Sequence, residues 1–456
     1  RHNPYYNYYH WWPAEKGEPP LRLSYFDEEG NAWMYNKSTD SYYLHYFSRK
    51  QPDLNWENPE VRQEIFDMMR FWFDKGIDGF RMDSISLIAK DPSFPLIDSK
   101  KYPDIFSFYA KEPRLHLYLH EMNRQVLSIY DCMSVGEGSA VMVDDVAKFV
   151  DPAREELNML YHFDAARIRN TTLPDNPESG IDYSLIALKK MFTEWDKAVD
   201  KGWPSIYLGN HDQPRMVSRF GSDKDEFRAL SAKMLITFLL TMRGTPYWFA
   251  GDEIGMRNIR FDRIEDYNDI DTINRYKKAK AEGKDPQAVL DEQKETGRDN
   301  ARTPFQWDRS PEAGFTAGTP WLKVNPDYTW INVADEEKDP TSILNYFKKV
   351  VSFRKENPSL IYGSYHLLDA ENPQSYTFLR KTGADTYLIM LNFSPKAAIS
   401  TPGIDMSNAH VLLDNYGDRS HMAPQKDITL RPFEAIVFQL NHPVYESFID
   451  SLDLLE

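Results

Sequence analysis

The stretch Gly76-Ile77-Asp78-Gly79-Phe80-Arg81-Met82-Asp83 decides the fold of this chain. It joins the end of a predicted helix to a short apolar run that extends to Ile85. The helix begins at Asn58-Pro59, an N-cap residue followed by proline at the first helical position, and Gly76 closes it. A helix followed at once by a short buried strand is the building unit of an α/β fold.

The same order of helix and strand recurs along the chain. Each occurrence places a short apolar run directly after a segment with helical periodicity. The pairs are 116–128 with 133–135, 185–199 with 205–208, and 225–242 with 246–250, and residues 157–163 form a further strand candidate. Alternation of this kind predicts parallel strands covered by helices.

Composition divides the chain into three zones. Residues 1–55 are rich in Pro, Gly, Asn and aromatic residues, which predicts a loop-rich module with a few strands. Residues 56–362 hold the alternating helices and strands, with a charged, helix-prone insertion at about 258–296 that we expect to be a solvated surface. Residues 363–456 contain short alternating segments separated by Gly, Pro and Asn, which predict an antiparallel β domain.

Three acidic residues stand at the carboxyl ends of predicted strands: Asp83, Glu137 and Asp212. In a barrel of parallel strands, that end of every strand points into the active-site face. A buried strand that ends in an unpaired carboxylate is otherwise costly, because the charge must be solvated or paired. For one such acid a structural ion pair explains the pattern equally well, but three at matching strand ends favour a catalytic site.

Carboxylates in this arrangement suit cleavage of a glycosidic bond. That reaction needs one acid to protonate the leaving oxygen and one carboxylate to trap the oxocarbenium-like centre, roughly 5–5.5 Å apart in retaining enzymes. Arg81 lies two residues before Asp83, on the same face of the strand, and its charge favours the ionised form of Asp83. Glu137 lies between glycines with no basic residue nearby in the sequence, so we expect it to hold a proton until it is needed.

The blocks Gly79–Asp83, Val135–Glu137 and Asn210–Asp212, in this order, resemble signature regions of the α-amylase family of glycoside hydrolases. Gln51–Asn55 resembles the marker of its oligo-1,6-glucosidase and α-glucosidase subfamily, and Gly297–Trp307 resembles that subfamily's block near the last barrel strand. The resemblance extends over nearly the whole chain. It implies a (β/α)8 TIM barrel over 56–362 from its third helix onward, an inserted domain B over 1–55, and a C-terminal antiparallel β-sandwich domain over 363–456.

The resemblance also implies an activity and the residues that perform it. The activity implied is that of a retaining, exo-acting α-glucosidase, which hydrolyses terminal α-glucosidic bonds of short malto- or isomalto-oligosaccharides. It implies Asp83 as the nucleophile, Glu137 as the general acid/base and Asp212 as the transition-state stabiliser.

Five further residues are implied at the sugar-binding pocket. Arg81 and His211 correspond to partners at the glucose site, and Arg298 to a residue near the aglycone site. Phe163 is a substrate-binding candidate. Ser84 follows the nucleophile where enzymes that prefer α-1,6 bonds usually have Val and those that prefer α-1,4 bonds have Thr. Its hydroxyl favours α-1,4 or mixed tolerance, and the preferred linkage stays open.

Two alternatives remain from the same evidence. Gln213 resembles the hydrolases, whereas Phe163-Asp164 is closer to sucrose isomerases, whose arginine-rich stretch is reduced here to Arg167-Ile168-Arg169. A sucrose isomerase or transglucosidase therefore stays open. A non-catalytic sugar-binding relative is the third reading, which the presence of all three acids disfavours.

The chain begins at Arg1 without Met, and the family's first signature region has no counterpart. We expect the first barrel strands, with a glucose-binding His and Asp, to lie upstream, so we do not expect these residues alone to close a barrel or to be active. No cofactor is expected and no metal is assigned, although the resemblance leaves room for a structural calcium ion bound through the upstream region.

Charge and cysteine usage limit the partners and the compartment. The net charge of −16 over 456 residues argues against nucleic acid and against anionic membrane surfaces. No apolar run approaches the length of a membrane span. Cys132 is the only cysteine, which fits a reducing compartment, so we expect a cytoplasmic protein acting on a small oligosaccharide. The sequence does not indicate an oligomeric state.

Overall fold

The computed structural model describes residues 3–26, 30–98, 100–102, 105–383, 385–420, 422 and 425–440. Arg1 and the last part of the expected β domain, 441–456, lie outside the described residues. The chain forms two compact units. The first contains Arg1–Phe163 and Lys197–Pro204, and the second contains Asp164–Asp196 and Ser205–Glu456. The three-zone division of the sequence stays a prediction.

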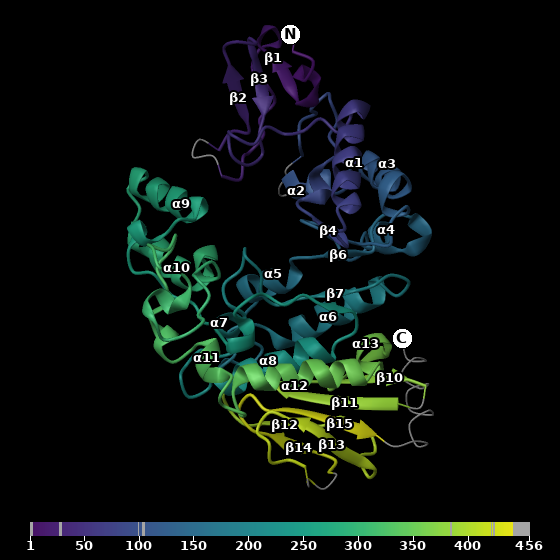
Figure 1. Cartoon of the computed structure of the whole chain (residues 1–456), viewed down its shortest axis with the longest axis vertical. Coiled ribbons are helices and arrows are strands. Elements are labelled where there is room, and N and C mark those ends of the chain that lie inside the picture. Colours follow the sequence, from purple (N-terminus) through teal and green to yellow (C-terminus); the bar gives the residue numbers. More distant parts are fainter. Residues whose placement is uncertain are drawn as a thin grey trace. The chain divides into compact units, whose positions relative to one another are not determined.

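The first unit opens with a small antiparallel sheet of three short strands, shown in purple in Figure 1. The central strand β3 (Ser41–Leu44) pairs with β1 (Trp11–Pro13) on one side and β2 (Trp33–Asn36) on the other. Aromatic residues fill its core. This cluster buries Ala32, Trp33, Leu44, Tyr46, Leu87, Phe94 and Tyr109, so it joins the sheet to the segment that follows Asp83.

Next in the first unit comes α1 (Pro59–Asp74), which begins as the sequence predicts because the Asn58 side chain accepts a hydrogen bond from the Glu60 backbone N–H at 3.0 Å. It leads through Gly76, whose φ of +92° suits glycine, into β4 (Gly79–Met82).

A parallel sheet follows in the order β4-β5-β6, with β5 at Met133–Glu137 and β6 at Met159–Tyr161. The helices between these strands are α2 (Ile105–Tyr109), α3 (Pro113–Met122) with a π-helical continuation (Asn123–Leu127), and α4 (Ala147–Val150). The parallel order agrees with the alternation in the sequence.

The second unit begins with further helices and a short parallel strand pair. It contains α5 (Asp164–Thr171) and most of α6 (Leu185–Ala198), then β7 (Ser205–Ile206), α7 (Met216–Phe220), α8 (Arg228–Thr241) and β8 (Thr245–Pro246). β7 and β8 are parallel. β8 is shorter than the expected 246–250, because the backbone turns after Tyr247: the Asp252 N–H donates to the Phe249 carbonyl at 3.1 Å.

The charged insertion forms two helices, α9 (Ile270–Ala281) and α10 (Pro286–Thr296), which pack against each other. They are not solvated on every side, because Leu290 is buried in a small cluster with Phe261, Tyr267 and Leu322. The expectation of a charged surface therefore holds only for the outer faces of α9 and α10.

Three more helices follow in the second unit. Short α11 (Val333–Glu336) and α13 (Ser359–Tyr362) flank α12 (Ile343–Glu356), which packs along α8.

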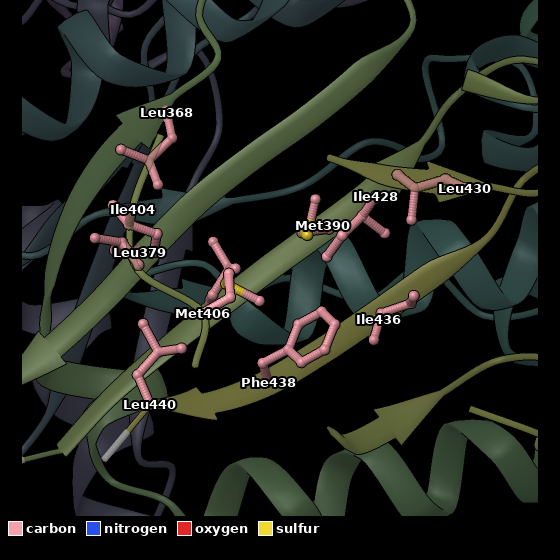
Figure 2. Close-up of a cluster of buried hydrophobic side chains, with 11 residues drawn as sticks. Leu368, Leu379, Met390, Ile404, Met406, Ile428, Leu430, Ile436, Phe438 and Leu440 are labelled. Carbon is pink, nitrogen blue, oxygen red and sulfur yellow. The ribbon is translucent and has the colours of Figure 1, made fainter. Parts of the chain in front are cut away.

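An antiparallel β region ends the described chain, as the sequence predicts. Its larger sheet has the order β13-β15-β11-β10-β9, and β12 pairs with β14. The strands are β9 (Ser364–Leu368), β10 (Ser375–Thr382), β11 (Asp385–Asn392), β12 (Ala398–Ser400), β13 (Ala409–Asp414), β14 (Ile428–Leu430) and β15 (Ala435–Leu440). Figure 2 shows the apolar core between them, in which Met390, Ile428 and Phe438 face one another.

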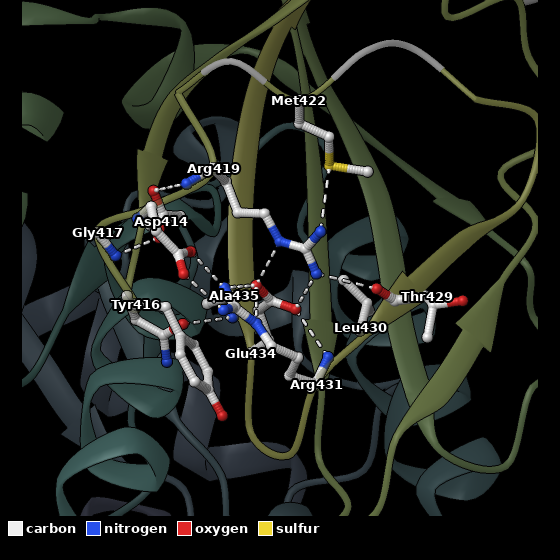
Figure 3. Close-up of polar contacts among 12 residues, drawn as sticks. Asp414, Tyr416, Gly417, Arg419, Met422, Thr429, Leu430, Arg431, Glu434 and Ala435 are labelled. Carbon is white, nitrogen blue, oxygen red and sulfur yellow. Dashed lines mark hydrogen bonds and ion pairs between the residues drawn. The ribbon is translucent and has the colours of Figure 1, made fainter.

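A buried carboxylate fixes one end of this β region. Glu434 has no solvent exposure and accepts hydrogen bonds from Arg419 and Arg431, and both guanidiniums lie around it in Figure 3. Arg431 also pairs with Asp418 and lies over the ring of Tyr416. Burial raises the pKa of Glu434, but the hydrogen bonds from the two arginines outweigh it and leave that pKa below its ordinary value.

Candidate active site

Asp83 stands at the end of β4 with its carboxylate open to solvent, since its side chain is 73% exposed. The next residue, Ser84, has a φ of +43°, the left-handed region that non-glycine residues rarely adopt. This bend begins the 3₁₀ turn Ile85–Leu87. Arg81, two residues before Asp83, forms an ion pair with it through Nη1, which is the contact that the strand periodicity predicts.

Glu137 ends β5 and has the opposite surroundings, being only 7% exposed. The glycines beside it are needed for this burial. A Cβ on Gly136 would lie 2.8 Å from atoms of Ile85 and Leu157, and one on Gly138 would lie closer still to Leu160. Apolar side chains can therefore close around Glu137 only because its neighbours have no side chains.

The polar contacts of Glu137 come from β4 and from the turn that follows it. Its Oε2 accepts the Ser84 backbone N–H at 3.0 Å and lies 2.7 Å from Nη2 of Arg81. A basic residue is thus close in space although none is close in the sequence. Burial raises the pKa of Glu137 to about 7, and the charge of Asp83 adds to the rise, while the Ser84 N–H and Arg81 oppose it. This carboxyl group is therefore able to hold a proton near neutral pH.

Sequence reasoning missed Tyr161, at the end of β6. Its hydroxyl accepts a hydrogen bond from Nε of Arg81 at 2.8 Å, and burial raises its pKa, so the phenol stays neutral. Phe163 lies against the Tyr161 ring edge to face, with centroids 6.0 Å apart. The first unit thus brings together four of the predicted residues, Asp83, Glu137, Arg81 and Ser84, with Phe163 next to them.

Asp212 lies in the second unit, in the turn between β7 and α7. Its backbone N–H donates to the Asn210 side chain at 2.8 Å, which shapes the turn. The carboxylate contacts Nε2 of His211 at 3.3 Å and Nη1 of Arg298 at 3.3 Å. The three residues predicted in this part of the chain, Asp212, His211 and Arg298, therefore belong to one group.

Two members of this second group were missed by sequence reasoning. Arg302 pairs with Asp212 through Nη2 and donates from Nε to the His211 carbonyl at 2.8 Å. Asp269, 3% exposed, accepts from Arg298 and lies 3.7 Å from Arg302. The buried Asp269 thus anchors both arginines that reach Asp212. Arg302 lies within the block 297–307, which was the available signal, whereas nothing near Asp269 in the sequence marks it.

In the described ranges, no group of three or more His, Cys, Asp and Glu side chains is arranged to hold a metal ion. None of the helices in the same ranges is long and apolar enough to cross a membrane. The two groups described above contain carboxylates, guanidiniums, a histidine and a phenol.

Comparison with known proteins gives consistent results. The α-amylase catalytic domain family matches residues 1–363. The chain is 47% identical over 452 residues to an oligo-1,6-glucosidase of Parageobacillus thermoglucosidasius, covering 97% of this chain and 79% of that protein. It is 44% identical to an oligo-1,6-glucosidase of Bacillus cereus, covering 96% of this chain and 78% of that protein.

Solved structures agree with the sequence comparisons. The isomaltulose synthase SmuA from Protaminobacter rubrum superposes with a TM-score of 0.89 at 38% identity, covering 97% of this chain and 79% of that chain. A trehalulose synthase in complex with Tris gives a TM-score of 0.90 at 38% identity, covering 96% of this chain and 79% of that chain.

Proposed function

Because this chain belongs to the α-amylase family of glycoside hydrolases, we propose that it removes terminal α-glucosyl units from short malto- or isomalto-oligosaccharides with retention of configuration. The observation that carries the proposal is the position of Arg81 between two carboxylates of opposite exposure. Asp83 is open and paired with a cation, and Glu137 is buried with a pKa near 7. An exposed, ionised carboxylate suits a nucleophile, and a buried carboxyl group with a raised pKa suits a proton donor.

The proposed reaction has two displacements. Asp83 attacks the anomeric carbon while Glu137 gives its proton to the departing glycosidic oxygen, which leaves a glucosyl ester on Asp83. Glu137, now ionised, then takes a proton from water, and the hydroxide attacks the same carbon and frees Asp83. Each carboxylate ends the cycle in its starting state. Two inversions give a net retention of the α configuration.

The group of residues around Asp212 also takes part in the proposed reaction. Asp212 carries negative charge that stabilises the positive character of the sugar ring in the transition state. The guanidiniums of Arg298 and Arg302 hold its carboxylate in one orientation, and His211 is exposed beside it as a hydrogen-bonding group for sugar hydroxyls. Arg298 is assigned to the aglycone side through the family resemblance.

The experiment that tests this function is product analysis by ¹H NMR in the first minutes of hydrolysis. The full-length protein should release α-glucose from maltose or isomaltose, and Asp83→Asn should abolish turnover while leaving the fold intact. Initial release of β-glucose, or wild-type turnover by Asp83→Asn, would overturn the mechanism. Rates on starch comparable with those on maltose would contradict the exo-acting assignment to short substrates.

Linkage preference is assigned to Ser84, the residue after the nucleophile. Its hydroxyl favours a preference for α-1,4 bonds or mixed tolerance, and one such contact contributes about 1–3 kcal/mol to discrimination. Ser84→Val should shift the ratio of kcat/KM for isomaltose over maltose upward. A panel of maltose, isomaltose, sucrose, trehalose and panose measures the preference directly.

A sucrose isomerase is the second candidate, favoured by the structural similarity to isomaltulose and trehalulose synthases. The arginines of the reduced stretch 167–169 argue against it, because they contact the protein itself: Arg167 lies 3.4 Å from Asp164, and Arg169 pairs with Asp182. Isomaltulose or trehalulose formed from sucrose, in place of glucose and fructose, would decide for the isomerase. We further propose a cytoplasmic location, supported by the single Cys132; cell fractionation tests it.

A further inference from the structure

An ion pair between a buried lysine and a partly exposed aspartate lies next to the turn that carries Asp83 and Ser84. Lys90 is 2% exposed, and its Nζ lies 2.7 Å from Oδ1 of Asp53. The ammonium group also lies over the rings of Tyr46 and Tyr109, at 5.6 and 5.4 Å from their centroids. This pair lies within the first unit and belongs to neither group of residues proposed to touch the sugar.

The two partners come from different parts of the first unit. Asp53 belongs to the segment 51–55, and its backbone N–H donates to the Leu44 carbonyl on β3 at 2.9 Å. Lys90 follows the 3₁₀ turn Ile85–Leu87. The ion pair therefore connects the N-terminal antiparallel sheet to the loop that leaves the nucleophile.

An unbroken series of hydrogen bonds runs from Lys90 to Glu137. Nζ of Lys90 donates to the Leu87 carbonyl, the Leu87 N–H donates to the Ser84 carbonyl at 2.9 Å, and the Ser84 N–H donates to Glu137 at 3.0 Å. The central residue of this series is the one with a φ of +43°. A non-glycine residue is strained in that region and persists there only where its surroundings enforce it.

Stability alone does not explain a charged pair in this place. Desolvation of two charges offsets most of their attraction, so an apolar pair of similar volume would stabilise the fold as well. The ammonium group of Lys90 donates a hydrogen bond to the Leu87 carbonyl and so fixes the end of the turn, which an apolar side chain does not do. The surroundings are already apolar and aromatic, so packing does not require the charge.

We propose that Lys90 and Asp53 form a positioning pair that holds the left-handed turn at Ser84 and thereby aims the Ser84 N–H at Glu137. This inference rests on the proposed function, since it assigns the pair a role in the same reaction. It makes the segment 51–55 a support of the general acid/base, although none of its residues is assigned to contact substrate.

Loss of the pair has a defined consequence. If the turn relaxes, the Ser84 N–H leaves Glu137, and a hydrogen bond that favours the ionised carboxylate disappears. The pKa of Glu137 then rises, and the proton donor loses its fixed orientation. We expect kcat to fall roughly 10- to 100-fold, because misplacement of a catalytic group by about an ångström costs on this order. KM should change little, because the sugar contacts are untouched.

The test compares Lys90→Met, Asp53→Asn and the conservative Lys90→Arg in the full-length protein, with Lys148→Met as the matched control. Lys148 also pairs with an aspartate, Asp145, but its side chain is 54% exposed. The measurements are kcat, KM, the pH profile of kcat/KM and Tm. Lys90→Met and Asp53→Asn should lower kcat and move the alkaline limb upward, Lys90→Arg should recover much of kcat, and Lys148→Met should match the wild type.

A double mutant separates positioning from general destabilisation. Glycine adopts the left-handed conformation at no steric cost, so in a Ser84→Gly background the turn no longer depends on the pair. The loss of kcat caused by Lys90→Met should be smaller there than in the wild-type background. Equal losses in both backgrounds, or a lower Tm with unchanged kcat and alkaline limb, would overturn the inference.

Two further outcomes lead to separate conclusions: a Lys90→Met variant that does not fold, and a wild-type protein without glucosidase activity. If Lys90→Met does not fold, Asp53→Asn decides, because it keeps the shape of the side chain and removes only its charge; unchanged kcat in that variant refutes the role of the pair. If the wild-type protein has no glucosidase activity, the proposed function fails, and this inference fails with it.

Discussion

Replacement of Arg81 by glutamine should move the alkaline limb of the pH–rate profile upward. The wild-type limb of kcat/KM is expected near pH 7, because kcat/KM reports the free enzyme and the pKa of Glu137 is raised to about 7 by burial. Arg81 opposes that rise from 2.7 Å. Glutamine keeps a hydrogen-bond donor at the site and removes the charge, so Glu137 becomes a weaker acid.

The size of the shift follows from the geometry. Unit charges roughly 4 Å apart interact by about 4 kcal/mol at an effective dielectric constant of about 20. The Arg81 side chain is 36% exposed, and solvent reduces such interactions to about 1 kcal/mol. Since one pKa unit corresponds to about 1.4 kcal/mol, the limb should move upward by about 1 pH unit. The maximum of kcat/KM should also fall by roughly 10- to 100-fold, because Asp83 loses a charge-assisted hydrogen bond of about 1.5–3 kcal/mol.

The assay is the initial rate of glucose release from maltose or isomaltose between about pH 4 and 9, at substrate concentrations well below KM. This pH range includes both the ordinary pKa of a carboxyl group, about 4, and the raised pKa of Glu137, about 7. Arg70→Gln is the control, because Arg70 is an arginine on α1 that pairs with Asp67. Its profile should match that of the wild type. An alkaline limb that stays in place or moves downward in Arg81→Gln would refute the assignment of that limb to Glu137.

Three further predictions concern single side chains. Glu137→Gln should lower kcat/KM on maltose by roughly 10²- to 10⁴-fold but far less on a nitrophenyl α-glucoside, because kcat/KM reports the first displacement and that leaving group needs no proton; equal losses of kcat/KM would contradict the acid role. Lys189 has no exposure and donates to two backbone carbonyls in the loop between β9 and β10 and to that of Ser375, the first residue of β10. Lys189→Met should therefore destabilise the fold by about 3 kcal/mol in chemical denaturation, and unchanged stability would refute this. Glu434 has a lowered pKa in the folded protein, so its contribution to stability is present above its ordinary pKa of 4.5 and is lost as the pH falls through the lower folded value. Glu434→Gln should therefore remove the part of the fall in Tm at acid pH that comes from this group, and an unaltered dependence of Tm on pH would contradict this.

Much of the fold was predictable because it depends on local patterns. The similar solved structures confirm the α/β barrel class with a C-terminal antiparallel β region. The helix starting at Asn58-Pro59 and the strand after Gly76 follow from capping and turn chemistry within a few residues. The length of β8 was not predictable, because an apolar run does not show where the backbone leaves its partner strand.

The candidate site divides in the same way. Contacts along one strand were predictable, and the pair formed by Arg81 and Asp83 is the clear case. Contacts across strands need the register of the sheet, which places Arg81 opposite Val135 and Glu137 opposite Tyr161. No local pattern contains that register, so the bonds from Arg81 to Glu137 and to Tyr161 were missed.

The unequal exposure of Asp83 and Glu137 explains how one arginine serves two carboxylates. If Glu137 and Asp83 were both ionised, these two carboxylates and Arg81 together would carry a net negative charge. Glu137 is the buried carboxyl group of the two, so it is the one that holds the proton. When Asp83 becomes a glucosyl ester, its negative charge disappears, and with it one cause of the raised pKa of Glu137. Glu137 then becomes a stronger acid, and its ionised form, which accepts a proton from water, gains in population. Loss of the Asp83 charge in the first displacement therefore shifts Glu137 towards the base that the second displacement needs.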